Sequence, residues 1–237
     1  MNKDNSNNPY LSTFQSLNVK NINEQYPQTN IVEVKEIKTK DVPYDEPFLY
    51  HGIGLLGFST ATLLLGIRIW NGYPNPKLLT VFGFFLGGLG QLVSAIMCYK
   101  YKYYIDGTCY FYFTFNWAIT TCYDLFPVYG WMEPLSGRDY GFHNLMGCLF
   151  TFVFFLQNLG APSYITRVSF STTFISFIFS TIGSFANSTA VTKIGGIFNI
   201  ITASLAYYSV VAMTINERYK KVWIPVLDGK KLCQKLD

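Results

Sequence analysis

The chain has 237 residues, of which 50% are hydrophobic, 18% aromatic and only 14% charged, whereas a soluble domain carries roughly 25% charged residues. The net charge of +4 comes from short basic runs between apolar segments, a pattern that indicates membrane topology and excludes nucleic-acid binding. The five cysteines are odd in number and lack CxxC spacing, which argues against a disulfide framework and a zinc site. We therefore expect an integral membrane protein without a metal or a cofactor.

Three parts follow one another along the chain. Residues 1–46 are polar and include eight asparagines, so they bury too little apolar surface to offset the entropy of ordering, and we expect a disordered cytosolic tail. Residues 47–216 are expected to form an all-α membrane domain of six transmembrane helices in one bundle, and residues 217–237 a basic cytosolic tail. The six predicted spans are residues 48–67, 78–99, 108–131, 140–159, 165–186 and 194–215.

Each span is long enough, at 1.5 Å per residue, to cross a hydrocarbon core of roughly 30 Å. The connections are short and contain glycine or proline, so each helix is expected to pack antiparallel to the next. Lysine and arginine near the helix ends set the orientation. Eleven lie on the side of the N-terminus and four on the other, which by the positive-inside rule places both termini in the cytosol. A plasma-membrane location is the natural expectation for such a chain.

The second span contains a glycine-rich stretch, residues 81–96, with a single amide at Gln91. Glycine at this density lets helices approach closely in a bilayer. Gln91, Asn116 and Asn199 lie in the interior thirds of three different spans. Each amide can bond a neighbouring helix for packing alone, but three amides converging on one axis would line a neutral, hydrogen-bonding route through the bundle.

Two titratable residues near the outer ends of the spans are candidates for a proton-linked function. Asp124 is the only carboxylate within the six spans and precedes Pro127 by three residues. It is expected either to pair with Arg138 or Lys193 in an outer vestibule or to bind protons. His143 lies near the start of its span and is expected to tune the outer mouth.

No enzyme signature is present. The motifs HExxH and GxSxG, a P-loop and paired carboxylates at one depth are all absent, and two histidines are too few for a metal centre.

The order of motifs along the spans resembles that of the acetate uptake transporters, the succinate–acetate permease family. Residues 87–91, GGLGQ, are similar to the GGxxQ of that family. Trp117 in the third span and the last span from Gly195 to Tyr208, followed by Asn216-Glu217 and Ile224-Pro225, continue the resemblance. Taken in order, the matches cover residues 54–226.

This resemblance implies six helices per protomer, a homo-oligomer that is a hexamer, and a separate pore in each protomer. It also implies passive or proton-linked movement of small monocarboxylate anions such as acetate. The family narrows its pore at an aromatic residue in the first helix, a tyrosine in the third and a leucine in the fifth. Those positions fall on Phe58, Phe113 and Thr173, so the pore is expected to be wider or wetter than in the family.

A larger departure lies at the start of the first span. The family's NPAPLGL signature at the inner entrance is replaced by residues 49–55, LYHGIGL, which retain only the small-residue ending. The entrance is therefore expected at His51, Gly52 and Gly54, where His51 could titrate near neutral pH.

Two hypotheses follow for the function. The first is a monocarboxylate pore lined by residues from five of the spans, because amides and hydroxyls replace the hydration shell of an anion without holding it too tightly. The lining residues of this hypothesis are Phe58, Gln91, Phe113, Asn116, Trp117, Thr173 and Asn199. The alternative is a non-conducting six-helix scaffold or sensor, which the loss of the NPAPLGL signature favours. A membrane-embedded enzyme is not supported by any catalytic constellation.

Overall fold

The structure, a computed structural model, describes residues 46–71, 77–160, 163–219 and 221–225. These residues form six helical rods and the turns between them. These residues belong to one compact unit, Pro43–Asp237. The rods in chain order are α2 (Glu46–Asn71), a composite of α3 (Lys77–Phe82), the π-helix η2 (Gly83–Gly90) and α4 (Gln91–Lys100), then α5 (Tyr104–Leu125), α6 (Gly137–Asn158), α7 (Tyr164–Phe185) and α8 (Thr189–Tyr219). The predicted N-terminal tail up to residue 45 and the last twelve residues lie outside the described ranges.

The prediction of six helices is confirmed, and the largest differences in helix ends are in the third and sixth rods. The third rod ends at Leu125 and not at residue 131, because Pro127 lacks a backbone donor and Gly130 turns the chain at a φ of +70°. The sixth rod runs from Thr189 to Tyr219, which exceeds its predicted span at both ends. The predicted basic tail therefore begins as the last turn of α8.

Four of the described helices are long and apolar enough to cross a membrane by composition alone: His51–Asn71, Lys77–Lys100, Tyr164–Phe185 and Thr189–Tyr219. The remaining two, α5 and α6, have 22 residues each and so extend about 33 Å at 1.5 Å per residue. Their lower hydropathy reflects polar residues that face cavities between the helices, as described below.

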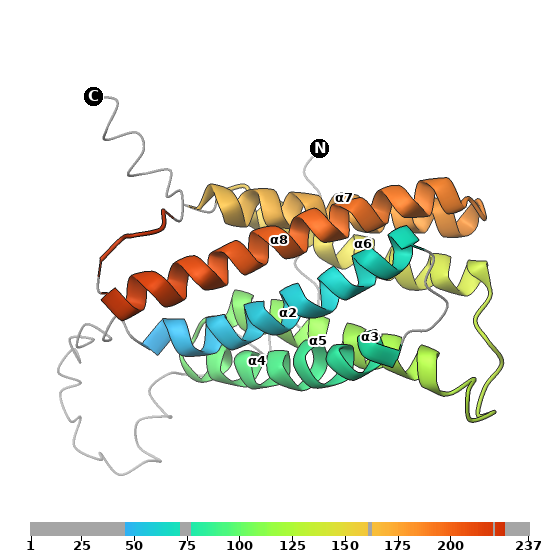
Figure 1. Cartoon of the computed structure of the whole chain (residues 1–237), viewed down its shortest axis with the longest axis horizontal. Coiled ribbons are helices and arrows are strands. Elements are labelled where there is room, and N and C mark those ends of the chain that lie inside the picture. The colour runs from blue at the N-terminus through green and yellow to red at the C-terminus, as the bar shows by residue number, and fades with distance from the viewer. Residues whose placement is uncertain (1–45, 72–76, 161–162, 220, 226–237) are drawn as a thin grey trace, which may run out of the picture. The chain divides into compact units, whose positions relative to one another are not determined.

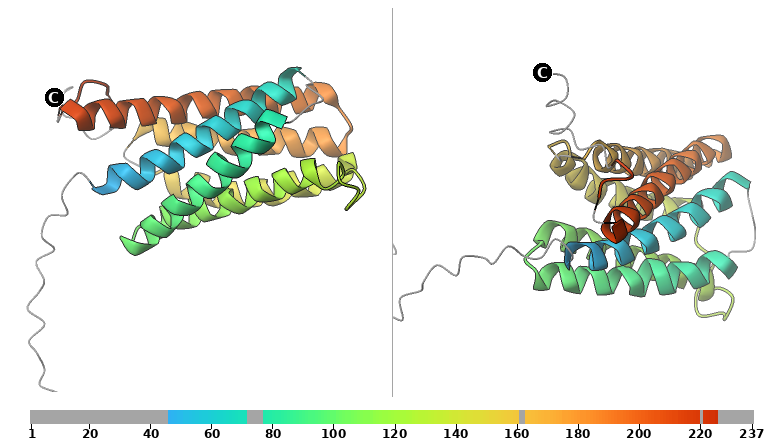
Figure 2. Two further views of the ribbon diagram at one scale, coloured as in Figure 1. Left: turned by 60° about the horizontal axis from the view of Figure 1, so that its bottom comes forward. Right: turned by 60° about the vertical axis from the view of Figure 1, so that its left-hand side comes forward.

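The helices pack as a bundle in which α2 has the central position (Figures 1 and 2). One side of α2 lies against α8 and the other against the α3–η2–α4 rod, while α7 joins α8 to α6 and α5 lies against η2 and α4. The Thr60 and Tyr207 hydroxyls bond at 2.5 Å, and the backbone of Gly66 approaches Gly196. α2 and α8 are therefore antiparallel, and the start of α2 lies at the same end as the end of α8, here called the inner end.

Glycine at the π-helix brings three rods together. A Cβ at Gly87 would lie 2.7 Å from Cγ of Trp117 on α5 and 3.0 Å from Cβ of Ala61 on α2. Trp117 is only 2% exposed and belongs with Ala61 and Phe113 to the main apolar core. Only a residue without a side chain permits this approach, so the prediction that the glycines serve close helix packing is confirmed at Gly87.

A capping box starts α6 at the outer end. The Ser136 hydroxyl accepts from the Asp139 amide at 3.3 Å, and the Asp139 carboxylate accepts from the Ser136 amide at 2.9 Å. This carboxylate is exposed and lies before the predicted span. The Ser136 hydroxyl and amide hold the pKa of Asp139 below its ordinary value.

Candidate functional site

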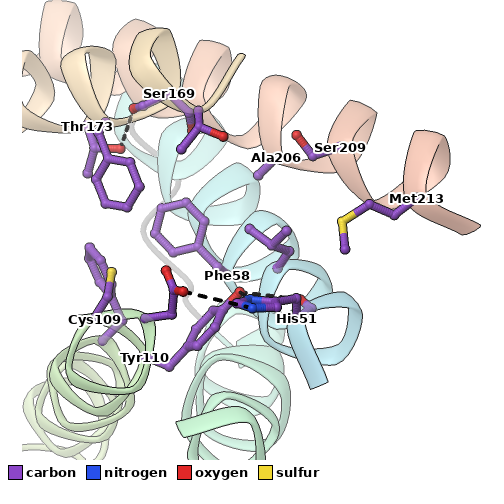
Figure 3. Close-up of a pocket in the computed structure, with 14 residues that line it drawn as sticks. His51, Phe58, Cys109, Tyr110, Ser169, Thr173, Ala206, Ser209 and Met213 are labelled. Atoms are coloured by element: carbon purple, nitrogen blue, oxygen red, sulfur yellow. Dashed lines mark hydrogen bonds and ion pairs between the residues drawn. The ribbon is translucent and has the colours of Figure 1, made fainter. Parts of the chain in front are cut away.

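An inner cavity of about 260 Å³ opens between α2, α5, α7 and α8 (Figure 3). Aromatic, hydroxyl and titratable side chains line it, chiefly His51, Phe58, Asp106, Tyr110, Phe113, Ser169, Thr173, Ala206, Ser209 and Met213. His51 and Tyr110 lie together on one side, Ser169 and Thr173 on the other, and the ring of Phe58 lies between them. The cavity thus collects one predicted entrance residue and three predicted pathway residues: Phe58, Phe113 and Thr173.

The His51 corner of this cavity joins α2 to α5. Nδ1 of His51 lies 3.4 Å from the Tyr110 hydroxyl, and Nε2 lies 3.9 Å from a carboxylate oxygen of Asp106. The Tyr110 hydroxyl also donates to the His51 carbonyl at 3.3 Å. The Tyr110 ring fits here because a Cβ at Gly54 would lie 2.6 Å from it. Gly54 therefore seats a lining residue, while Gly52 does not line the cavity.

Two phenylalanine rings close the outer end of the inner cavity. The Phe58 and Phe113 centroids are 4.9 Å apart, with the rings inclined at 61°, an edge-to-face arrangement. Thr173 is 4% exposed, and its hydroxyl donates to the Ser169 carbonyl one turn earlier at 2.7 Å. That hydroxyl is therefore occupied within its own helix, and the aromatic pair lies beside it in the cavity wall.

An outer cavity of about 480 Å³ lies at the opposite end of the same helices, with α6 as a fifth wall. It is more polar than the inner cavity and contains the predicted residues Asn116, Asp124, His143 and Asn199. Asn199 accepts from the Ser176 hydroxyl at 2.8 Å. The His143 ring meets Tyr123 edge-on at 5.4 Å. Two of the three predicted amides thus share one cavity.

Gln91 and Trp117 lie elsewhere, in the interface of η2 and α4 with α2 and α5. Gln91 is fully buried, and neither end of its amide has a hydrogen-bond partner within the described ranges. Its side chain lies near Gly57 of α2, and Gln91 lines neither cavity. Trp117 packs against Gly87, and its indole N–H also lacks a partner in the described part of the chain.

Asp124 forms an ion pair with Arg68. The sequence had suggested Arg138 or Lys193 as its partner, and that prediction is wrong. Nη1 of Arg68 lies 3.2 Å from Oδ1 and 3.1 Å from Oδ2 of the carboxylate. The Asp124 side chain is 6% exposed and that of Arg68 is 28% exposed. Their positions in the sequence could have indicated this pair, because both residues lie in the last turns of helices that start at the inner end.

Three contacts between α2 and α5 form a ladder along the two cavities. The residues of each pair are separated by 55 or 56 positions, because the two helices run in the same direction. The rungs, from the inner to the outer end, are His51–Asp106, Phe58–Phe113 and Arg68–Asp124. The Phe58–Phe113 contact therefore lies between a histidine–aspartate pair and an arginine–aspartate ion pair along the two helices.

Known proteins resemble this chain in sequence and in fold. The model of the GPR1/FUN34/yaaH family matches residues 51–228. The succinate-acetate/proton symporter SatP of Escherichia coli is 23% identical over 174 residues, which are 73% of this chain and 92% of that protein. Ammonia transport outward protein 2 of Saccharomyces cerevisiae is 26% identical over 171 residues, 68% of this chain and 59% of that protein. The structure of the bacterial acetate channel SatP superposes with a TM-score of 0.71 at 21% identity, covering 74% of this chain and 97% of that one.

Proposed function

Because this chain belongs to the GPR1/FUN34/yaaH family, we propose that it carries small monocarboxylate anions such as acetate across the membrane. One relative is named a succinate-acetate/proton symporter, and the matching structure is that of an acetate channel. The proposed route runs within one protomer, between α2, α5, α7 and α8.

One observation carries this proposal: two cavities lie at opposite ends of the same helices, and the contact of Phe58 with Phe113, here called the gate, lies at the side of the inner cavity that faces the outer one. Each cavity is far larger than the volume of about 30 Å³ that one water occupies in the liquid. A solute can therefore reach the gate hydrated from either side and needs to lose water only there.

The gate limits what crosses it. A carboxylate without a partner is costly to bury among phenylalanine rings, so the solute must be small and must either keep some of its water or cross as the neutral acid. The hydroxyls and amides on both sides, among them Ser209, Asn116 and Asn199, provide hydrogen bonds in place of lost water. Passive and proton-linked transport are both compatible with this lining.

The proposal is tested by reconstituting the purified chain in liposomes and following labelled acetate. We expect uptake above that of empty vesicles, and a decline in rate from acetate to longer monocarboxylates, because the gate admits only slender solutes. Uptake equal to that of empty vesicles, with helical content retained in the same vesicles by circular dichroism, would refute the transport proposal and favour the non-conducting scaffold.

We also propose that the protomers assemble into a homo-oligomer, a hexamer by the family resemblance. Large apolar side chains are exposed along the outward faces, for example Leu78, Phe85 and Ile96, each 58% exposed. They suit either lipid or a second protomer. Native mass spectrometry of protein released from nanodiscs should give six chains per particle, and a monomer would contradict the proposal.

A further inference from the structure

The ion pair at the outer rung stands out because it buries charge in the wall of a cavity. Arg68 donates to both oxygens of Asp124, and the Thr80 hydroxyl of α3 lies 3.4 Å from Oδ2. Helix packing does not require such a pair, since apolar side chains of similar size serve packing at least as well. Arg68 nevertheless remains 28% exposed and lines the outer cavity.

The carboxylate of Asp124 occupies the place at Arg68 that a substrate carboxylate would take. A guanidinium binds a carboxylate through its N–H donors, and Asp124 is itself such a ligand, held through Nη1 in the wall of the outer cavity. An anion that enters the cavity therefore competes with Asp124 for one cation. The anion can displace Asp124 only if the charge left on Asp124 is removed, because an unpaired buried carboxylate is strongly disfavoured.

We propose that Arg68 and Asp124 form a proton-linked exchange site for the substrate carboxylate, a role that rests on the proposed function. In the loaded state, Asp124 has taken one proton from the outer solution, and the carboxylate of the substrate accepts the Arg68 N–H groups. The proton then passes from the carboxyl of Asp124 to the carboxylate of the substrate. Asp124 returns to Arg68, and the neutral acid leaves for the gate. Each cycle moves one proton with one anion.

The place of the pair on the ladder fits this role. Arg68 is ten residues beyond Phe58 on α2, about 15 Å at 1.5 Å per residue; Phe58 lines the inner cavity and Arg68 the outer one. A neutral acid released from Arg68 therefore meets the phenylalanine gate in the form that costs least to bury there. On the inner side of the gate, the His51–Asp106 rung provides groups that can accept the proton.

Other titratable groups surround the pair on every side and contribute to its charge balance. Those that line the same cavity are Tyr123 on α5 and Tyr140 and His143 on α6. Two lysines lie on elements that pack nearby: Lys77 starts α3, and Lys193 on α8 has its ammonium over Trp70 of α2. α7 contributes serines and Phe177, and the turn after it contributes Asn187, but neither contributes a titratable group to this cavity. Asp124 is the only carboxylate in the cavity wall among the described residues.

The test is proton uptake on acetate binding to the purified full-length chain, read with a pH-indicator dye in weakly buffered detergent solution. The wild-type protein should take up about one proton per acetate bound, and its affinity should rise as the pH falls. Asp124→Asn should bind acetate without proton uptake and with little dependence on pH. Asp124→Glu should restore both, since it keeps the titratable group. Arg68→Gln should weaken binding by about tenfold or more.

Arg138→Gln is the matched control, because Arg138 is an exposed arginine in the first turn of α6 at the same end, and it should leave both readings unchanged. Proton uptake that persists in Asp124→Asn would overturn the exchange site. Should Asp124→Asn not fold with its arginine unpaired, the double variant Arg68→Gln/Asp124→Asn carries the test, and proton uptake by that variant would equally overturn it. Absence of acetate flux in the wild-type protein would instead refute the proposed function.

Discussion

Replacing Phe58 with alanine removes half of the proposed gate. The Phe58 ring contacts Phe113 at 4.9 Å between centroids, and we expect its loss to widen the passage between the inner and outer cavities. If the wider passage lets the solute keep one additional hydrogen bond to water, worth about 0.5–1.5 kcal/mol net, the barrier falls by that amount. The acetate flux should then rise about two- to tenfold, since 1.4 kcal/mol corresponds to a factor of ten.

The assay is initial uptake of labelled acetate and butyrate by liposomes with equal amounts of folded protein. Butyrate should gain more than acetate, because the wider gate relaxes selection by size. Phe111→Ala is the matched control. Phe111 also lies on α5, but it is 44% exposed, does not line the inner cavity and contacts Phe115 and not Phe58. An unchanged or lower flux in a folded Phe58→Ala protein, or an equal gain in Phe111→Ala, would refute the gate.

Three further predictions concern packing, the buried amide and a helix cap. Gly87→Ala should lower the free energy of unfolding by about 1–3 kcal/mol, because its Cβ would lie 2.7 Å from Trp117. Gly88→Ala is the control and should lower it less, because its Cβ would have no contact nearer than 3.6 Å. Equal losses of stability in a denaturant titration would contradict the packing at η2. Gln91→Leu should leave acetate flux unchanged, because Gln91 lines neither cavity. The variant should be at least as stable as the wild type, because the substitution removes a buried amide without partners among the described residues. A loss of flux in the folded variant would show that Gln91 belongs to the pathway. Ser136 holds the pKa of Asp139 below its ordinary value. The capping box therefore contributes stability at a pH above the ordinary carboxyl pKa, and this stability is lost as the pH falls through the lowered pKa of Asp139. Amide exchange at the start of α6 should therefore be faster in Asp139→Asn than in the wild type at pH 7, and equal protection at pH 7 would contradict this role.

Three of the predicted pathway residues were supplied by the family resemblance, and regular helical geometry lets these positions carry over to this chain. Phe58, Phe113 and Thr173 lie in uninterrupted α-helices, where the spacing of motifs fixes depth, and the structure brings all three to one cavity. Asn116 and Asn199 likewise share the outer cavity. Whether these residues bind substrate stays a prediction.

Gln91 shows why the rest of the site could not be predicted. The eight residues before it form a π-helix, in which each amide bonds the fifth residue back. This winding changes the direction of the residues that follow, so a face assigned by α-helical periodicity does not hold at Gln91. Glycine density signalled close packing but not the winding.

The Arg68–Asp124 pair was missed for a different reason. The sequence indicated a carboxylate near the outer end of the third helix but gave no measure of which helix lies beside it. Lys193 and Arg138 are also at the outer end, so depth alone did not select the partner. The parallel course of α2 and α5, which the fold reveals, selects Arg68.

The central claim is that acetate crosses within one protomer, through the inner cavity, and a plug in that cavity tests it most directly. Ser209 lines the cavity on α8, and Val211, two residues further on, is 47% exposed. Labelled acetate uptake should fall at least about tenfold in Ser209→Trp, as expected when a bulky ring closes the proposed route, and should match the wild type in Val211→Trp. Equal uptake by the folded Ser209→Trp and wild-type proteins would contradict the account.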